Sequence, residues 1–272
     1  MEENISMALG DEFLPVERRK SLARRAWRNF VQGLYETTRT LYTSKDTICA
    51  SVAIEGEEYL KRALEKGKGA IALGAHLGNF TMIGPRLAAA GYPSSILVKH
   101  PPDQRLARLL DGYRAKAGVK TISAKPRRQA ARQILGALRR NEVVIVLPDV
   151  FKPGSVNAQF LGAPVYIRRG PVTLALRAGA AVVPMCVTRD AEDRLTLHIS
   201  PEIDLVKTGD GQEDVAVNLT LFIRHLEEMV RRYPEQWCRL SPHQLPSKNV
   251  RRIFPDFVQP GLKLKEVKER RS

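Results

Sequence analysis

Short apolar stretches alternate with longer amphipathic stretches along most of this chain, and this alternation constrains the fold more than any other feature. Strands are predicted at residues 52–54, 68–73, 95–98, 119–122, 143–147, 164–166, 181–187 and 195–199. Helices are predicted at 57–66, 81–90, 103–117, 127–139, 171–178 and 215–233. Strands that are separated by helices indicate crossover connections. We therefore predict a single α/β domain whose central, mostly parallel or mixed sheet is flanked by helices.

A further helix is predicted at residues 16–43, before the alternation begins. Its apolar residues fall at spacings compatible with one face, and its first half is crowded with basic residues. The apolar residues are Leu22, Ala26, Trp27, Phe30, Val31, Leu34 and Leu41. A basic amphipathic helix either lies in a lipid interface or packs its apolar face on the core, and both interpretations remain open. We divide the chain into an N-terminal segment (1–45), a main domain (46–258) and a basic tail (259–272).

The net charge of the chain limits the classes of molecule that we expect it to bind. The chain has 44 Lys and Arg residues against 29 Asp and Glu residues, a net charge of +15. Such a charge favours anionic lipid, phosphorylated substrates, acidic carrier proteins or nucleic acid. Aromatic residues make up only 6% of the chain and no nucleic-acid motif is recognised, so we expect no nucleic-acid partner.

The targeting and cysteine patterns indicate the compartment. The N-terminus is acidic and lacks a long apolar core, so we predict no secretory signal. No stretch approaches about 18 consecutive apolar residues, so any membrane attachment is expected to be peripheral. Cys49, Cys186 and Cys238 are far apart and form no C-x-x-C pair, which argues against a disulfide framework and fits a reducing compartment.

Two segments that follow predicted strands carry polar residues suited to chemistry. Reactive residues in α/β sheets tend to lie just past the carboxyl ends of strands. G-A-H-L-G-N-F, which contains His76, follows one strand, and L-P-D-V, which contains Asp149, follows another. Glycines on both sides of His76 allow a sharp turn and a close approach of substrate. A histidine here is either a structural hydrogen-bonding residue or a base that accepts and returns a proton.

The run G-K-G-A-I-A-L-G-A-H-L-G-N-F resembles the first motif of the lipid A lauroyl/myristoyl acyltransferases, within the lysophospholipid acyltransferase superfamily. Further matches follow in the same order over residues 25–243. They are the arginine and glycine of 114–118, the strand and aspartate of 144–149, Gly154, the F-L-G-A-P of 160–164, the segments 170–184 and the P-E-Q-W of 234–237. The resemblance implies a glycerolipid acyltransferase-like fold.

The resemblance also implies an activity. A fatty acyl group would pass from a thioester, carried on acyl carrier protein or coenzyme A, to a hydroxyl of a lipid A precursor or related glycolipid. The reaction would take place at the cytoplasmic face of the inner membrane, without a metal or another cofactor. His76 would act first as base and then as acid, and N–H groups near Gly78 and Asn79 would stabilise the oxyanion.

The resemblance further suggests residues that bind substrate. Arg114 is the family's arginine, whose planar fork suits phosphate, and Lys99 and Lys152 are weaker candidates for binding anions. Gly162 lies in the segment that resembles the family's F-F-G-x-P, and we assign it to substrate binding as well.

One departure from the family pattern concerns the partner of the histidine. The family normally has Asp or Glu five residues after the histidine, and this chain has Thr81. Asp149 is our candidate to replace that carboxylate, because it also ends a strand. Two alternatives keep the fold: a divergent member that binds lipid or carrier protein without catalysis, and a hydrolase in which His76 activates water. The hydrolase would release free fatty acid, whereas the binding protein would form no acylated product.

Overall fold

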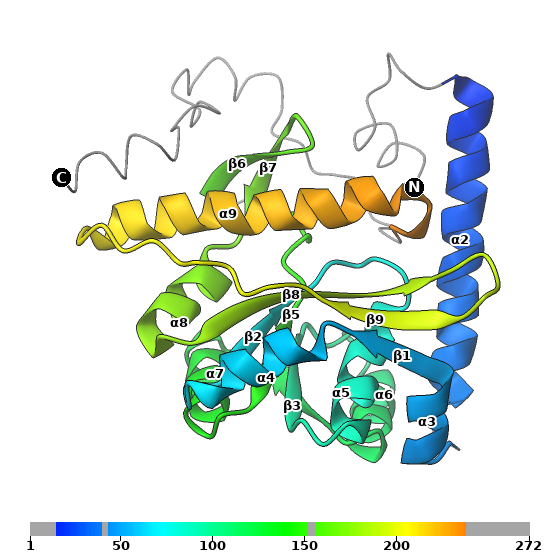
Figure 1. Cartoon of the computed structure of the whole chain (residues 1–272), viewed down its shortest axis with the longest axis horizontal. Helices are drawn as coiled ribbons and strands as arrows, with labels where there is room; N and C mark the ends of the chain where they lie inside the picture. Colours follow the sequence, from blue (N-terminus) through cyan, green and yellow to red (C-terminus); the bar gives the residue numbers. More distant parts are fainter. Residues whose placement is uncertain (1–14, 40–42, 152–155, 238–272) are drawn as a thin grey trace.

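A computed structural model describes residues 15–39, 43–151 and 156–237 of the chain (Figure 1). These residues form a seven-stranded sheet in the order β1-β9-β8-β2-β5-β3-β4. Its strands are β1 Val52–Glu55, β9 Leu195–Ile199, β8 Ala181–Arg189, β2 Ala70–Leu73, β5 Val143–Val146, β3 Ser94–Val98 and β4 Val119–Ser123. The β8–β9 pair is antiparallel and the other neighbouring pairs are parallel. The predicted α/β class with a mostly parallel, mixed sheet is confirmed.

Helices cover both faces of the sheet, because successive side chains of a strand point to opposite faces. On β2, Ala70 and Ala72 belong to one apolar core, whereas Ile71 and Leu73 belong to the other. The first core includes residues of α3 Lys45–Ser51, α4 Glu57–Glu65 and α5 Ile83–Ala89. The second includes residues of α7 Arg127–Arg139, α8 Gly170–Ala178 and α9 Gly211–Arg232. α6 Gln104–Lys116 packs against the edge strand β4.

Several elements differ from the sequence-based prediction, and three of them are near the proposed site or its flanks. α3 was not predicted; Ser44 caps this short helix by accepting a hydrogen bond from the Thr47 amide. β6 Val156–Phe160 was also not predicted, and it pairs antiparallel with β7 Ala163–Ile167 across a two-residue turn. The helix expected at 81–90 is divided into a 3₁₀ turn, η3 Phe80–Met82, and α5. Short elements such as these depend on caps and tertiary partners more than on sequence periodicity.

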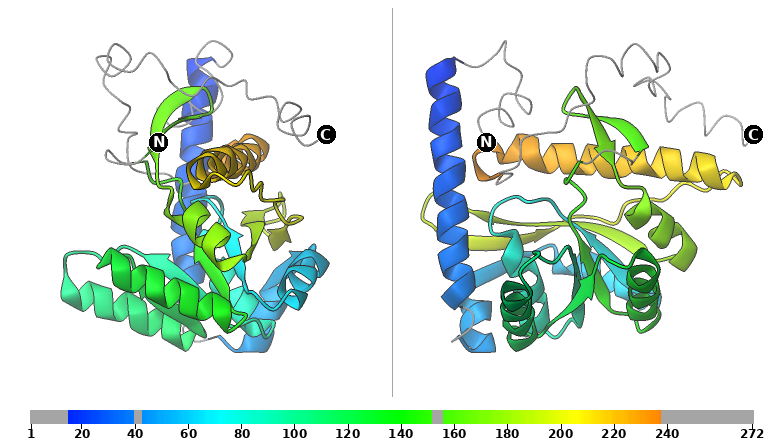
Figure 2. Two further views of the ribbon diagram at one scale, coloured as in Figure 1. Left: turned by 90° about the vertical axis from the view of Figure 1, so that its left-hand side faces the viewer. Right: turned by 180° about the vertical axis from the view of Figure 1, so that it is seen from behind.

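The long N-terminal helix α2 Val16–Arg39 stands along one side of the molecule, while α9 crosses its top (Figures 1 and 2). α2 was predicted at 16–43, and residues 40–42 with Leu41 lie outside the described residues. Leu22 and Ala26 are buried, but Trp27, Val31 and Leu34 are about half exposed. The predicted N-terminal helix is confirmed. Of the two interpretations of its apolar residues, packing on the core holds for Leu22 and Ala26, whereas Trp27, Val31 and Leu34 face outward.

The boundaries between the N-terminal segment, the main domain and the tail stay predictions, and the tail (259–272) lies outside the described residues. α2 is attached to the domain through η4 Pro234–Gln236 and η3. Among the residues that the structure describes, none of the helices is both long enough and apolar enough to cross a membrane.

Candidate active site

The register of two adjacent parallel strands brings His76 and Asp149 together. Leu73, the last residue of β2, is paired with Val146, the last residue of β5. His76 and Asp149 each follow these paired residues by three positions, so they leave the sheet at the same edge and at the same level. The structure thus joins the two strand-end residues that the sequence singled out.

Asp149 is completely buried and accepts three hydrogen bonds. Its Oδ1 lies 2.6 Å from Nδ1 of His76, and its Oδ2 accepts from the His76 amide at 3.0 Å and from the Trp237 indole at 3.2 Å. Burial raises the pKa of this carboxyl, but the charge of the imidazole and these hydrogen bonds outweigh burial and lower the pKa to about 2. Asp149 is therefore an anion at neutral pH, held in place from three directions.

This contact defines the state of the imidazole. A carboxylate only accepts hydrogen bonds, so Nδ1 of His76 carries a proton, and in the neutral form of the ring Nε2 carries the lone pair. The His76 side chain is 29% exposed, and its ring forms a T-shaped pair with Phe80 at a centroid distance of 4.8 Å. A histidine oriented by a buried carboxylate is an arrangement that suits a general base.

Trp237 completes the surroundings of Asp149, although sequence reasoning gave it no place in the site. It forms a bridge with Leu77 in the histidine loop, and its ring packs against Phe160 of β6 with a centroid distance of 5.8 Å. Phe160 in turn packs against Phe151, which follows Asp149 by two positions. The only sequence signal was the aromatic residue at the end of P-E-Q-W, and its indole donor shows why a tryptophan suits this position.

The backbone amides of Gly78 and Asn79, expected to lie near the oxyanion, donate to carbonyl groups of the protein in this structure, and their contact with substrate stays a prediction. The Gly78 amide donates to the carbonyl of Gln236 at 2.7 Å, and the Asn79 amide donates to the carbonyl of Val187 at 3.0 Å. Both donors are therefore occupied inside the protein. Gly78 has a φ of +56°, and a Cβ here would come within 1.9 Å of the Val187 carbonyl oxygen. The glycine is needed for the close approach of β8, and this contact accounts for it without a substrate.

Thr81 points toward α2. Its hydroxyl donates to Oδ1 of Asn79 at 2.6 Å and forms a very short contact with the hydroxyl of Thr37 on α2. The side-chain nitrogen of Asn79, Nδ2, donates to Oε2 of Glu36 at 2.9 Å. The position where the family has a carboxylate thus belongs to a polar contact between α2 and the histidine loop. Asp149 occupies the place beside Nδ1 of His76.

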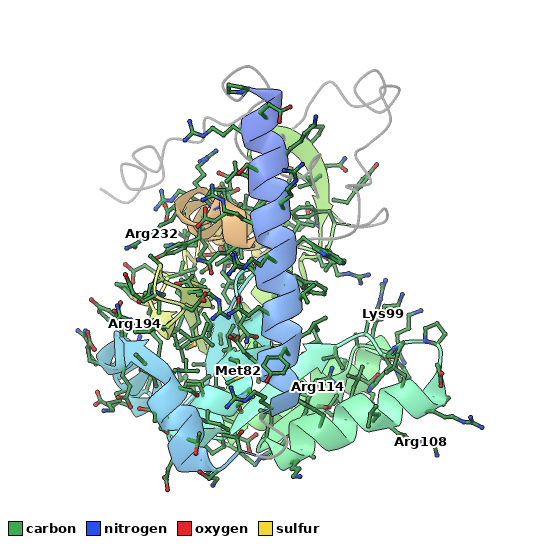
Figure 3. All side chains as sticks on the ribbon, turned by 90° about the vertical axis from the view of Figure 1, so that its right-hand side faces the viewer. Met82, Lys99, Arg108, Arg114, Arg194 and Arg232 are labelled. Carbon is green, nitrogen blue, oxygen red and sulfur yellow. The ribbon has the colours of Figure 1, made fainter. Side chains whose placement is uncertain are left out.

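The predicted anion binders lie elsewhere on the molecule. Arg114, near the end of α6, donates to Oδ1 of Asp111 at 3.0 Å, and that carboxylate also contacts His100 at 2.8 Å. Lys99 follows β3 and is exposed; both residues are labelled in Figure 3. Lys152 lies outside the described residues. Contact of Arg114 or Lys99 with a substrate stays a prediction.

Gly162 occupies the turn between β6 and β7. Leu161 and Gly162 both have positive φ values, +53° and +79°, as a tight two-residue hairpin requires. The Leu161 amide donates to Glu227 of α9 at 2.6 Å, which fixes the hairpin on that helix. This turn explains the glycine, and its contact with substrate stays a prediction. Gly154 lies outside the described residues.

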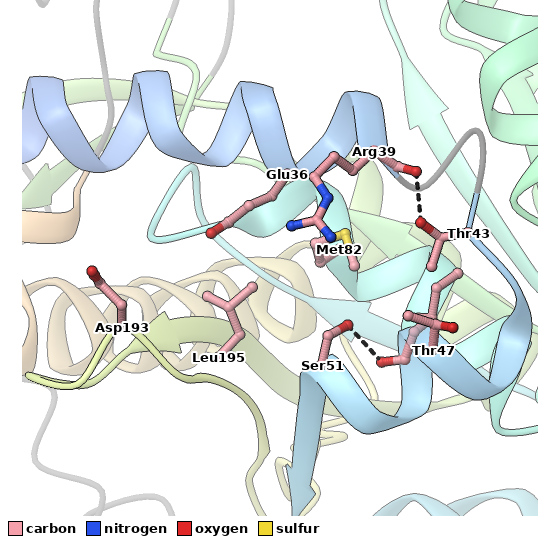
Figure 4. A pocket seen from close by; sticks show the side chains of 9 residues that line it. Glu36, Arg39, Thr43, Thr47, Ser51, Met82, Asp193 and Leu195 are labelled. Carbon is pink, nitrogen blue, oxygen red and sulfur yellow. Dashed lines mark hydrogen bonds between the residues drawn. The ribbon is translucent and has the colours of Figure 1, made fainter.

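A hollow of about 190 Å³ lies on the α2 side of the histidine loop (Figure 4). Glu36 and Arg39 of α2, Met82 of η3 and Asp193 of the β8–β9 connection are among its lining residues. His76 is not among them, so the hollow is separate from the imidazole. Within residues 15–39, 43–151 and 156–237, no group of three or more His, Cys, Asp or Glu side chains is arranged to hold a metal ion.

Comparisons with known proteins find similarity to acyltransferases. A lipid A biosynthesis palmitoleoyltransferase of Escherichia coli (strain K12) is 24% identical over 225 residues, which cover 81% of this chain and 70% of that protein. A phosphatidylinositol mannoside acyltransferase of Mycobacterium tuberculosis (strain H37Rv) is 26% identical over 196 residues, which cover 71% and 60%. Among solved structures, a 1-acyl-sn-glycerophosphate acyltransferase of Thermotoga maritima has a TM-score of 0.39 at 15% identity, covering 83% and 91%.

The family described as bacterial lipid A biosynthesis acyltransferase matches residues 1–244, which is most of the chain. The histidine loop, the strand that ends before Asp149 and the P-E-Q-W segment all lie within the matched residues. This chain belongs to the bacterial lipid A biosynthesis acyltransferase family and is an acyltransferase.

Proposed function

We propose that this protein transfers a fatty acyl group from an acyl thioester to a hydroxyl group of a glycolipid, with His76 as base and Asp149 as its partner. The observation that carries the proposal is the 2.6 Å contact between Nδ1 of His76 and the fully buried Asp149. A buried charge of this kind requires compensation, and the imidazole, a backbone amide and the Trp237 indole supply it. The same contact directs the lone pair of the ring to Nε2.

The chemistry follows from this tautomer. Nε2 of His76 takes the proton of the acceptor hydroxyl while the oxygen attacks the thioester carbonyl. The resulting tetrahedral intermediate then collapses, the C–S bond breaks, and the imidazolium returns its proton to the departing thiolate. Asp149 stabilises the imidazolium between these steps and keeps its own negative charge, since its pKa is about 2.

The relatives suggest the classes of substrate. The name of one relative specifies lipid A biosynthesis, and the name of another specifies a phosphatidylinositol mannoside. Lipid A and phosphatidylinositol mannosides are both glycolipids. We propose a lipid A precursor or related glycolipid as acceptor, with acyl carrier protein or coenzyme A as the thioester carrier. The surplus of 44 basic over 29 acidic residues supports an anionic carrier or acceptor.

We place the protein peripherally at the cytoplasmic face of the inner membrane, with α2 as the docking element. The outward side of α2 carries Trp27, Val31, Leu34 and Tyr35, which are 47–63% exposed. Arg24, Arg25 and Arg28 are also exposed on this helix. Apolar and aromatic residues next to arginines are typical of helices that lie in a lipid interface.

Acyl transfer from a radiolabelled thioester to glycolipid extracts would test the proposal. We expect His76→Ala to reduce turnover about 10²–10⁴-fold, the usual contribution of general base catalysis. We expect a loss of similar order from Asp149→Asn, because an amide does not maintain the Nδ1–H tautomer in the same way. His225→Ala is the matched control: this histidine lies on α9 and pairs with Glu228.

The products separate the alternatives. Acylated lipid at wild-type level from His76→Ala would exclude this mechanism. Free fatty acid without acylated lipid would indicate a hydrolase. Absence of any acylated product from the wild type, together with retained lipid or carrier binding, would indicate a binding protein.

A further inference from the structure

A polar cluster connects α2 to the histidine loop on the side away from Asp149. Nη2 of Arg189, at the end of β8, donates to both carboxylate oxygens of Glu36, at 2.5 and 2.6 Å. Asn79 donates to the same carboxylate, and a Cβ on Gly33 would lie 3.4 Å from the Asn79 side chain. α2 thus approaches the histidine loop closely and brings one negative charge to it.

The cluster forms a closed ring of hydrogen bonds through the P-E-Q-W segment. The Gln236 side chain accepts from the Arg189 amide at 2.9 Å and donates to the Arg189 carbonyl at 2.8 Å. The Gln236 carbonyl accepts from the Gly78 amide, and Gly78 is followed by Asn79. The path therefore runs from Glu36 to Arg189, Gln236, Gly78, Asn79 and back to Glu36. The histidine loop is held within this ring on both sides of the Gly78–Asn79 peptide.

Glu36 is the member of the ring whose charge matters most. Its carboxylate offers two oxygens, and both are used: one accepts from Arg189, the other from Arg189 and Asn79. The Arg189 side chain is only 7% exposed, so little water competes for this pair. An amide has a single acceptor oxygen and cannot serve both neighbours in the same way.

We propose that Glu36 is a positioning residue: from α2, through Arg189 and Asn79, it fixes the loop that carries His76. Asp149 contacts His76 from the sheet, and Glu36 brings a second carboxylate to the same loop from α2. If α2 docks on lipid as proposed above, the same helix contacts both the membrane and the histidine loop. Its outward face meets the membrane and its inward face sets the position of the base. This part of the inference rests on the proposed function.

Hydrogen exchange of the Gly78 and Asn79 amides tests the position of the loop without any substrate. In the wild type these amides are bonded to Gln236 and Val187 and should exchange slowly. We expect Glu36→Gln to speed their exchange at least tenfold, while amides in the centre of β2 stay protected. Glu36→Asp keeps the charge but shortens the side chain, and should give an intermediate rate. Glu17→Gln is the matched control, since Glu17 is on the same helix and 84% exposed.

The second part of the test measures kcat and KM of the Glu36 variants. We expect Glu36→Gln to lower kcat about tenfold or more with little change in KM for the thioester, because the base is misplaced and the donor site is untouched. In the double variant Glu36→Gln/Asn79→Asp, donor and acceptor are exchanged while the charge of the cluster is kept. This double variant should recover slow exchange and part of kcat.

Two results would overturn the proposal: unchanged exchange of Gly78 and Asn79 in Glu36→Gln, or an equal effect from Glu17→Gln. A loss of melting temperature with unchanged kcat per folded molecule would show that Glu36 only stabilises the fold. The exchange arm does not depend on acyl transfer, so a failure of the proposed function would leave this test valid.

Discussion

A single side chain explains most of the local order around the proposed base. Asp149 receives Nδ1 of His76, the His76 amide and the indole of Trp237, so one buried carboxylate fixes the tautomer, the backbone and the closing segment together. Thr81, at the position of the family's carboxylate, bonds instead to Thr37 and Asn79. Asp149, which follows the neighbouring strand β5, supplies the carboxylate beside Nδ1 of His76.

This arrangement predicts an acid dependence of stability. The pKa of Asp149 is lowered from 3.8 to about 2, so its stabilising contribution is complete above about pH 4 and is lost as the pH falls toward 2. The shift corresponds to about 2 kcal/mol. Urea unfolding of the wild type and Asp149→Asn at a series of pH values isolates this group. We expect the difference in the free energy of unfolding that is found at pH 5 to shrink below pH 4. An equal difference at pH 2.5 and 5.5 would contradict the assignment.

At the scale of elements, α2 has two faces with separate roles. Leu22, Ala26 and Gly33 face the domain, and Asn29 donates to the Glu235 carbonyl at 3.1 Å. The opposite face carries the exposed apolar residues and arginines. Periodicity alone does not distinguish these faces, because apolar residues lie on both of them.

The outward face of α2 leads to a prediction about lipid binding. Sedimentation with anionic vesicles should fall as salt rises, since each basic residue near the surface contributes about 1 kcal/mol that ions screen. The double variant Trp27→Ala/Tyr35→Ala should weaken binding on the order of tenfold at every salt concentration, because apolar burial is lost. The melting temperature should stay unchanged, since both side chains are exposed.

Leu106→Ala/Leu109→Ala on α6 is the control for this experiment, because these leucines are 44% and 68% exposed on another helix. An equal loss of binding in both double variants would show that α2 is not the main docking element. Equal binding to neutral and anionic vesicles would remove the electrostatic part of the proposal.

At the scale of the whole molecule, distant segments converge on the histidine loop. β8 approaches Gly78 from one side, the P-E-Q-W segment reaches it from the C-terminal part of the described chain, and α2 closes the N-terminal side. At Gly78 the missing side chain makes room for the Val187 carbonyl of β8, and the Gln236 side chain lies close by.

Gly78→Ala therefore tests how much free energy of unfolding depends on the close contact between Gly78 and β8. Any residue with a side chain at positive φ costs about 1 kcal/mol, and forced overpacking adds about 1–3 kcal/mol. Gly67→Ala is the matched control: its φ is +68°, and nothing lies within 4 Å of an added Cβ. We expect Gly78→Ala to lower the free energy of unfolding by clearly more than Gly67→Ala in urea titrations. Equal losses would mean that β8 can move away without cost.

The sequence by itself determined the kinds of elements and the residues that end them. Apolar strands and amphipathic helices are local patterns, and the α/β class follows from their alternation. His76 and Asp149 were identified because each lies directly after a buried strand. The motifs also indicated the family, since their order along the chain is a property of the sequence alone.

Only the tertiary structure decided which of these residues meet. β2 pairs with β5 although β3 and β4 lie between them in the chain, and this order and its register place Asp149 beside His76. Trp237, Arg189 and Glu36 reach the histidine loop from other parts of the chain. P-E-Q-W marked Trp237 as part of a motif but not as a neighbour of Asp149, and no local pattern marks Arg189 or Glu36. Strand order, register and the choice of buried helix face depend on packing between distant segments, which periodicity along the chain does not encode.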